Sequence, residues 1–139
     1  MKKKKSTTIY LMDDDHSVYD SMSLLLSHIN IQLDFFKHIH ELQQSIDKTP
    51  PLCLLIELNL KPYCGLDIYQ SLSVPPPTIF LSTYCNTKMA VKVMQTGAID
   101  LIEKPFSEQR LITSIKNIID KPNHSPSRTF VHDKSKFNS

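Results

Sequence analysis

The sequence predicts an α/β domain built around a five-stranded, mostly parallel sheet. Short apolar runs alternate five times with segments in which apolar residues recur at helical spacing. The central run contains no polar residue, as expected for a strand covered by helices on both faces. Right-handed crossovers between parallel strands place the helices on both sides of the sheet. The 139 residues suffice for one such domain with a continuous core.

The first strand and the first helix are predicted near the N-terminus. Residues 8–12 form a short, mostly apolar strand, which ends at three consecutive aspartates. Apolar side chains then recur at helical spacing and predict an amphipathic helix over residues 16–27. Asp15 or Ser17 is expected to cap its first turn, because a short polar side chain there can accept a free backbone N–H.

The next elements lead to the centre of the predicted sheet. Residues 31–36 form a second strand with a less regular alternation, and residues 38–47 form a short helix. Pro50-Pro51 interrupts the chain, because proline lacks the N–H that regular structure requires. The wholly apolar residues 52–56 then form a central strand, which ends at Glu57.

The second half repeats the same alternation. A third helix follows Gly65, and a run of three prolines separates it from a fourth strand over residues 78–81. A fourth helix over residues 87–96 has Gly97 at its C-cap. Residues 99–102 form the fifth strand, and a final helix carries an apolar stripe of Leu111, Ile112, Ile115, Ile118 and Ile119.

Composition limits the partners and the location that we expect. The net charge of +2 is too small to indicate a nucleic-acid or membrane partner. No apolar run approaches the length of a membrane span, and no apolar segment of a signal peptide follows the N-terminal lysines, which predicts a cytoplasmic location. Residues 1–7 and residues 121–139 are polar, so we interpret them as disordered ends around a domain over residues 8–120.

Polar side chains follow four of the five predicted strands. Three aspartates begin at Asp13, a single carboxylate stands at Glu57, a hydroxyl pair begins at Ser82, and an amine stands at Lys104. Parallel sheets place their sites outside the carboxyl ends of the strands, so we expect these groups to converge. Clustered carboxylates bind Mg²⁺, whereas a hydroxyl and a lysine can hold phosphoryl oxygens. A central carboxylate can also attack phosphorus and form an acyl phosphate.

These motifs and their spacing resemble the receiver domains of response regulators in two-component phosphorelays. The resemblance covers about residues 8–120, and residues 89–100 are similar to the FixJ-type branch. It rests on short motifs that are weak singly and strong in combination: Asp13-Asp14, Glu57-Leu58-Asn59-Leu60, Gly65, Ser82, and Glu103-Lys104-Pro105-Phe106.

The resemblance implies a flavodoxin-like fold, with five helices and a parallel sheet in the order 2-1-3-4-5. It implies that Asp13, Asp14 and the backbone carbonyl of Asn59 hold Mg²⁺. Ser82 and Lys104 correspond to the residues that contact the phosphoryl group. The implied partners are a histidine kinase or a downstream protein, with no direct contact to nucleic acid or membrane, and the domain is not expected to be an enzyme.

The resemblance also implies a homodimer or partner surface formed by the fourth helix, the fifth strand and the last helix. Leu101 occupies the aromatic switch position on this surface. A leucine cannot alternate between two positions as a ring with a polar tip does. Val91 and Ile115 belong to the same region, and we expect both to be buried against the sheet.

The most consequential departure from the family pattern is Glu57, which stands where the family has its phosphate-accepting aspartate. The extra methylene moves the carboxylate outward by roughly 1.5 Å, a displacement that can cost about 100-fold in rate. Thr83 stands where a small residue is preferred and is expected to crowd a phosphoryl group, and Lys61 stands where a proline is expected, with Pro62 after it. Glu57 therefore either imitates the charged, phosphorylated state or is an inert carboxylate that pairs with Lys104 and the metal.

The leading hypothesis is a stand-alone, degenerate pseudo-receiver that signals by protein interaction without phosphotransfer. One alternative is a functional phosphoacceptor. Another is a truncated transcriptional regulator, because the sequence shows no helix-turn-helix segment after the last predicted helix. A flavodoxin-type flavin enzyme would share the strand order, but an acidic triplet stands where its phosphate-binding loop is expected.

Overall fold

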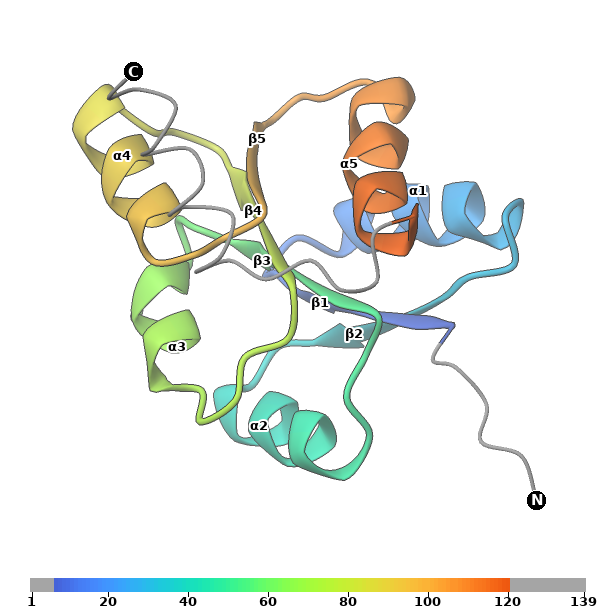
Figure 1. Ribbon diagram of the computed structural model, residues 1–139, viewed down its shortest axis with the longest axis horizontal. Helices are drawn as coiled ribbons and strands as arrows, with labels where there is room; N and C mark the ends of the chain where they lie inside the picture. The colour runs from blue at the N-terminus through green and yellow to red at the C-terminus, as the bar shows by residue number, and fades with distance from the viewer. Residues whose placement is uncertain (1–6, 121–139) are drawn as a thin grey trace.

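The structure is a computed structural model that describes residues 7–120. Five strands alternate with five helices along the chain (Figure 1). The strands are β1 (Thr8–Met12), β2 (Gln32–Phe36), β3 (Cys53–Glu57), β4 (Thr78–Ser82) and β5 (Asp100–Glu103). The helices are α1 (His16–Ser27), α2 (Ile39–Lys48), α3 (Gly65–Ser71), α4 (Thr87–Gln95) and α5 (Glu108–Asp120).

The strands form one parallel sheet in the order β2-β1-β3-β4-β5, which confirms the expected fold class. Every residue of β3 and β4 is buried. This burial explains why the central strands are apolar at successive positions instead of alternating. β2 and β5 lie at the edges and retain partly exposed residues.

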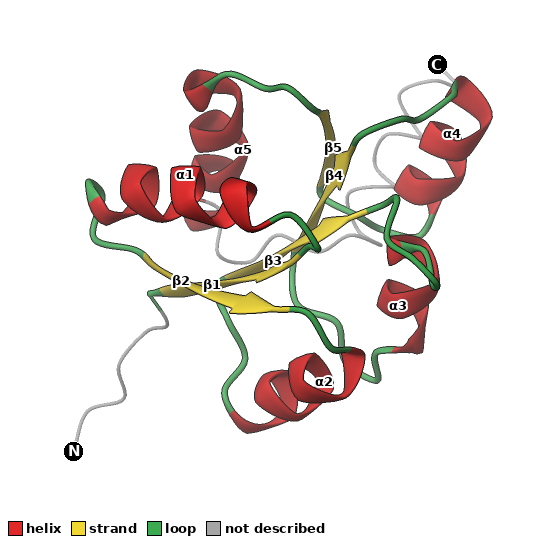
Figure 2. Ribbon diagram, turned by 180° about the vertical axis from the view of Figure 1, so that it is seen from behind, coloured by secondary structure: helices red, strands yellow, loops and turns green. Residues whose placement is uncertain are grey.

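The helices cover the sheet in two layers, with α1 and α5 on one face and α2, α3 and α4 on the other (Figure 2). Side chains from alternate strand positions enter opposite layers, so Leu54 and Ile56 pack towards α2 and α3, whereas Leu55 packs towards α1 and α5. None of these helices is both long and apolar enough to cross a membrane.

Most predicted boundaries agree with the structure to within one or two residues. Asp15 is the cap of α1, and its carboxylate accepts the N–H of Ser17 at 3.0 Å. α4 has its C-cap at Thr96, and Gly97 is the next residue, with a φ of 102°. The expected C-cap at Gly97 is therefore wrong by one residue, although glycine is still required there because of the positive φ.

The two ends that we interpret as disordered lie almost wholly outside the described residues, which exclude 1–6 and 121–139. Thr7 is described, and its carbonyl accepts the N–H of Gln32 at 3.0 Å. The backbone pairing between the first two strands therefore begins one residue before β1.

Candidate phosphoryl-type site at the carboxyl edge of the sheet

Three of the predicted site residues meet in a buried group that we call the carboxylate–lysine cluster: Asp13, Glu57 and Lys104. Asp13 directly follows β1, Glu57 ends β3, and Lys104 directly follows β5. Because all five strands are parallel, their carboxyl ends lie at one edge of the sheet. The parallel topology thus brings together residues that are far apart in the sequence.

Lys104 joins the two carboxylates of this cluster. Its Nζ lies 2.6 Å from Oε1 of Glu57 and 2.9 Å from Oδ2 of Asp13. Burial by itself lowers the pKa of Lys104, but the hydrogen bonds and charges of the two carboxylates outweigh this effect and leave the pKa raised. The ammonium group is therefore held in its charged form.

Asp13 shares this single cation with a second carboxylate. Burial raises the pKa of Asp13 and the charge of Glu57 adds to the rise, whereas the hydrogen bonds from Lys104 and from the N–H of Asp15 oppose it. The net direction is upward. Two buried carboxylates and one ammonium leave an excess of negative charge, which favours any cation that can approach the cluster.

The carboxylate of Glu57 is surrounded by donors. Its Oε1 accepts a hydrogen bond from the hydroxyl of Thr83 at 3.2 Å, in addition to the bond from Lys104. Its Oε2 accepts the backbone N–H of Asn59 at 2.8 Å and that of Thr83 at 3.3 Å. A hydroxyl, an ammonium and two backbone N–H groups form the kind of cradle that binds an anion.

Ser82, which the resemblance assigns to the phosphoryl group, is buried and has no hydrogen bond to Glu57 among the described residues. Its hydroxyl lies 3.4 Å from Oδ1 of Asn59, and the hydroxyl that reaches Glu57 belongs to Thr83. The family pattern predicts only that Thr83 crowds a phosphoryl group, and it gives no sign that this residue donates to the carboxylate. The longer side chain at position 57 is the sequence feature that could have indicated this contact.

Asp14 lies apart from the contacts around Lys104. It is exposed, whereas Asp13 is buried, and both line a cavity of about 210 Å³ together with Lys37 and Lys61. Asp14 therefore lines the same cavity as Asp13, with an exposed side chain that forms no ion pair with Lys104 among the described residues. The direct reason is that successive residues at the end of an extended strand point in opposite directions.

The oxygen ligands expected for Mg²⁺ nevertheless fit that ion chemically. Mg²⁺ is usually bound by one or two carboxylates and several waters, and both Asp13 and Asp14 line the same cavity. Within residues 7–120, no group of three or more His, Cys, Asp or Glu side chains is placed to hold a metal. An ion here would depend on these two carboxylates, the carbonyl of Asn59 and water.

Comparison with known proteins identifies the family. The model of the response regulator receiver domain matches residues 9–116, which is most of the chain. The chain belongs to the response regulator receiver family. It is therefore a receiver domain of a two-component response regulator, and receiver domains are signalling domains. Receiver domains of this family generally bind Mg²⁺ at the site of phosphorylation.

Relatives and solved structures agree with this assignment. The receiver domain is 29% identical over 115 residues to the response regulator protein TodT of Pseudomonas putida strain F1, covering 81% of this chain and 51% of TodT. It is 27% identical over 117 residues to the transcriptional regulatory protein FixJ of Bradyrhizobium diazoefficiens, covering 80% and 56%. The chain thus spans about half the length of these curated relatives.

A crystal structure of a response regulator receiver protein from Pseudoalteromonas atlantica is also similar. It shares 26% identity with this receiver domain, with a TM-score of 0.74, and the match covers 83% of this chain and 98% of that one. The likeness to FixJ and to solved receiver structures confirms the expected resemblance to the FixJ-type branch.

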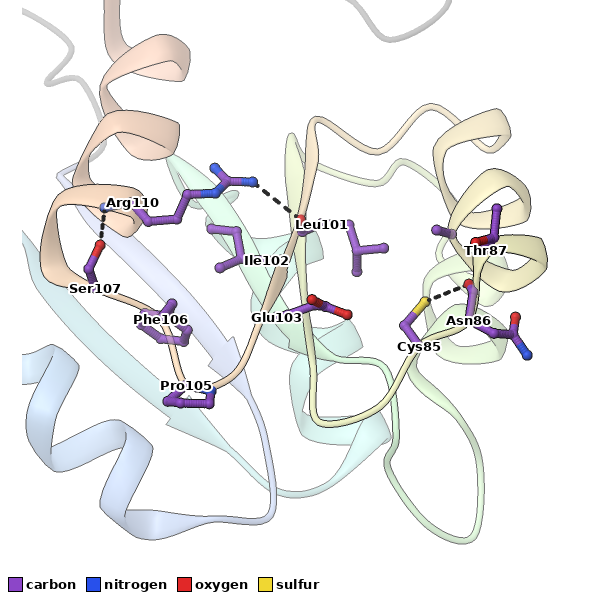
Figure 3. A pocket seen from close by; sticks show the side chains of 11 residues that line it. Cys85, Asn86, Thr87, Leu101, Ile102, Glu103, Pro105, Phe106, Ser107 and Arg110 are labelled. Carbon is purple, nitrogen blue, oxygen red and sulfur yellow. Dashed lines mark hydrogen bonds between the residues drawn. The ribbon is translucent and has the colours of Figure 1, made fainter.

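The surface that carries Leu101 lies beside the site of the receiver domain. Leu101 is partly buried and packs on the side of α4, and it lines a groove of about 590 Å³ over β5 (Figure 3). The start of α4 forms one wall, and Phe106, Ser107 and Arg110 form the other. Ile115 is buried as expected, but Val91 is 51% exposed, so the expectation for Val91 is wrong.

Proposed function

We propose that this receiver domain signals through protein interaction without phosphotransfer, because the carboxylate of Glu57 already fills the anion cradle at the carboxyl edge of the sheet. The observation that supports this proposal is the set of four donors around Glu57: Lys104 Nζ at 2.6 Å, Thr83 Oγ1 at 3.2 Å, and the N–H groups of Asn59 and Thr83 at 2.8 and 3.3 Å.

The position of the carboxylate favours imitation of a charged state over an inert pair. An inert carboxylate would need only Lys104 and the metal, whereas here both carboxylate oxygens also hold the loop between β4 and α4 through Thr83. A negative group that reaches this loop is what a phosphoryl group on residue 57 would supply. Glu57 supplies this negative charge permanently, so the surface around Leu101 keeps one conformational state.

The roles of the remaining site residues follow from this proposal. Lys104 neutralises the carboxylate of Glu57, and Ser82 and Thr83 present hydroxyls from the end of β4. Mg²⁺, when bound, would be held by Asp13, Asp14 and the carbonyl of Asn59, and it would reduce the excess negative charge at the carboxylate–lysine cluster. The partner is a histidine kinase or a downstream protein that binds the surface around Leu101, and this surface is also the proposed homodimer contact.

A labelling experiment tests the proposal. The parent protein and Glu57→Asp are incubated with Mg²⁺ and radiolabelled acetyl phosphate, and with a histidine kinase where one is identified. We expect no label above background on the parent, and label at least about tenfold above background on Glu57→Asp. The reason is that the shorter side chain withdraws the carboxylate from the cradle and leaves room for phosphorus.

The matched control is Glu57→Gln, which keeps the length of the side chain and removes the nucleophile. It should remain unlabelled. A phosphate adduct located at Glu57 of the parent by mass spectrometry would instead establish the alternative of a working phosphoacceptor, and the proposal would be abandoned.

The second candidate is the receiver part of a transcriptional regulator. The relative FixJ is named a transcriptional regulatory protein, and the match covers 56% of it. The intact mass of the protein isolated from its native cell distinguishes the two. A mass near 16.0 kDa supports the stand-alone domain, and a mass near twice that value supports the longer regulator.

A further inference from the structure

The side chain of Asn59 connects two loops at the site. Its Oδ1 accepts the backbone N–H groups of Thr83 and Tyr84, each at 2.9 Å, and lies 3.4 Å from the hydroxyl of Ser82. The backbone N–H of Asn59 in turn donates to Glu57 at 2.8 Å. Three donors converge on one atom of the amide, which identifies that atom as the oxygen, because an NH₂ group cannot accept them.

These contacts join two loops through a residue that is itself exposed. Asn59 lies in the loop between β3 and α3, and its side chain crosses to the loop between β4 and α4, which leads to the groove beside Leu101. Thr83 is shared, since its N–H lies 2.9 Å from Oδ1 of Asn59 and 3.3 Å from Oε2 of Glu57. Two side chains of the β3 end therefore hold the same loop.

We propose that Asn59 is a second internal ligand of the site and the positioning residue of the β4–α4 loop. Together with Glu57, it occupies the hydroxyl of Ser82 and the N–H of Thr83, which a phosphoryl group on residue 57 would otherwise contact. The inference rests on the proposed function and extends it, because it implies that Glu57 is only half of the internal substitute for phosphate.

The proposal has a consequence for the phosphorylation of the Glu57→Asp variant. In Glu57→Asp, a carboxylate oxygen attacks the phosphorus of acetyl phosphate, the bond from phosphorus to the acetate oxygen breaks, and acetate leaves with the electron pair. The new phosphoryl oxygens then need donors, but Asn59 still occupies those of Ser82 and Thr83. Restoring the aspartate alone should therefore give slow labelling, and removal of the Asn59 side chain should accelerate it.

The first test measures amide hydrogen exchange in the unphosphorylated protein. In Asn59→Ala, the N–H of Tyr84 loses its acceptor and should exchange about tenfold faster or more, as measured by NMR. The N–H of Thr83 loses the shorter of its two contacts and keeps Glu57 at 3.3 Å, so its exchange should rise by less. Asn59→Asp keeps an oxygen at the same place and should retain the protection. Asn117→Ala, a like substitution at an exposed residue of α5, should leave both amides unchanged.

Two outcomes of this test would overturn the proposal. One is equal exchange of Thr83 and Tyr84 in the parent and Asn59→Ala, which would mean that the loop is held by other contacts. The other is lost protection in Asn59→Asp as well, which would mean that the oxygen acceptor is not what matters. Because Asn59 is exposed, both variants are expected to fold.

The second test compares labelling by acetyl phosphate in Glu57→Asp, in Glu57→Asp/Asn59→Ala, and in the control Glu57→Asp/Asn117→Ala. We expect the variant without the Asn59 side chain to label about tenfold faster than the other two. Equal or slower labelling would overturn the shared-donor argument. Labelling of the parent would contradict the proposed function instead, and the amide-exchange result would still decide the role of Asn59.

Discussion

Lys104 shows at the scale of a single residue why the site is sensitive to substitution. Its side chain is 16% exposed, and its ammonium group faces Glu57 and Asp13, whose side chains are 2% and 0% exposed. A buried ion pair adds little net stability compared with a well-packed apolar pair, but removal of one partner leaves a buried charge without compensation. A substitution of one member of the cluster should therefore lower the free energy of unfolding by more than the intact ion pairs contribute to it.

We expect Lys104→Met to lower the free energy of unfolding at pH 7 by about 3–5 kcal/mol, because it leaves two buried carboxylates without a cation. Adding Glu57→Gln in the same chain should recover a part of this loss, since only one buried charge then remains. Urea unfolding followed by circular dichroism gives both values.

Lys92→Met serves as the control for the charge change, because Lys92 is an exposed residue of α4. It should alter stability by no more than about 0.5 kcal/mol. If Lys104→Met proved as mild as Lys92→Met, Asp13 and Glu57 would have to be solvated or protonated in the native protein.

Gly65 shows how one element constrains the next. A Cβ atom on this residue would overlap the backbone carbonyl oxygen of Glu57, and the N–H of Gly65 donates to the carbonyl of Leu58 at 2.8 Å. The start of α3 is therefore pressed against the end of β3, where the carboxylate is placed. This explains in physical terms why a glycine stands eight residues after the acceptor position.

Asp100 links the edge strand β5 to the last helix, α5, through hydrogen bonds. Its carboxylate accepts two hydrogen bonds from Arg110, at 2.7 and 2.9 Å, and one from the buried hydroxyl of Ser114 at 2.8 Å. Burial tends to raise the pKa of Asp100, but the bonds from Arg110, Ser114 and the N–H of Leu101 outweigh it and hold the pKa below its usual value.

We expect Asp100→Ala to lower stability at pH 7 by about 1–3 kcal/mol, because the hydroxyl of Ser114 is left buried without its acceptor. Because the folded pKa is depressed, this contribution is present above the ordinary pKa of 3.8 and is lost as the pH falls through the folded pKa. The difference in stability between parent and variant should therefore narrow below about pH 4 in urea titrations, while the part that comes from the Ser114 hydroxyl persists.

Arg110→Ala provides the comparison, because it removes the other partner of the Asp100–Arg110 ion pair. The Arg110 side chain is 44% exposed, so we expect a cost below about 1 kcal/mol. A difference between parent and Asp100→Ala that stayed constant from pH 7 to pH 3 would show that the charge of Asp100 contributes nothing to stability.

At the scale of the whole molecule, the groove beside Leu101 is a hollow between two helices on opposite faces of the sheet (Figure 2). α4 covers one face of the sheet and α5 the other, and the groove over β5 lies between their N-terminal ends (Figures 1 and 3). Val91 and Met94 of α4 are 51% and 39% exposed. Exposed apolar side chains beside a groove are typical of a protein contact, and they lie where the family resemblance predicts one.

We expect the protein to self-associate through this surface and Val91→Lys to weaken the association by about tenfold, since a charge would be buried at the contact. Sedimentation velocity over a concentration series measures the dissociation constant. Leu24→Lys is the matched control, because Leu24 is 66% exposed on α1. A monomer at every concentration, or an equal effect of both substitutions, would exclude this surface as the dimer contact.

The sequence by itself determined the order of strands and helices, the central position of β3, and the meeting of Asp13, Glu57 and Lys104. These follow from local periodicity, from apolar composition and from the rule that parallel strands end at one edge. The tertiary structure alone decided that Thr83 and not Ser82 donates to Glu57, and that Asn59 binds the neighbouring loop. It also decided that Asp14 and Val91 are exposed. Such details depend on loop paths and side-chain rotamers fixed by contacts between distant segments, which no local pattern encodes.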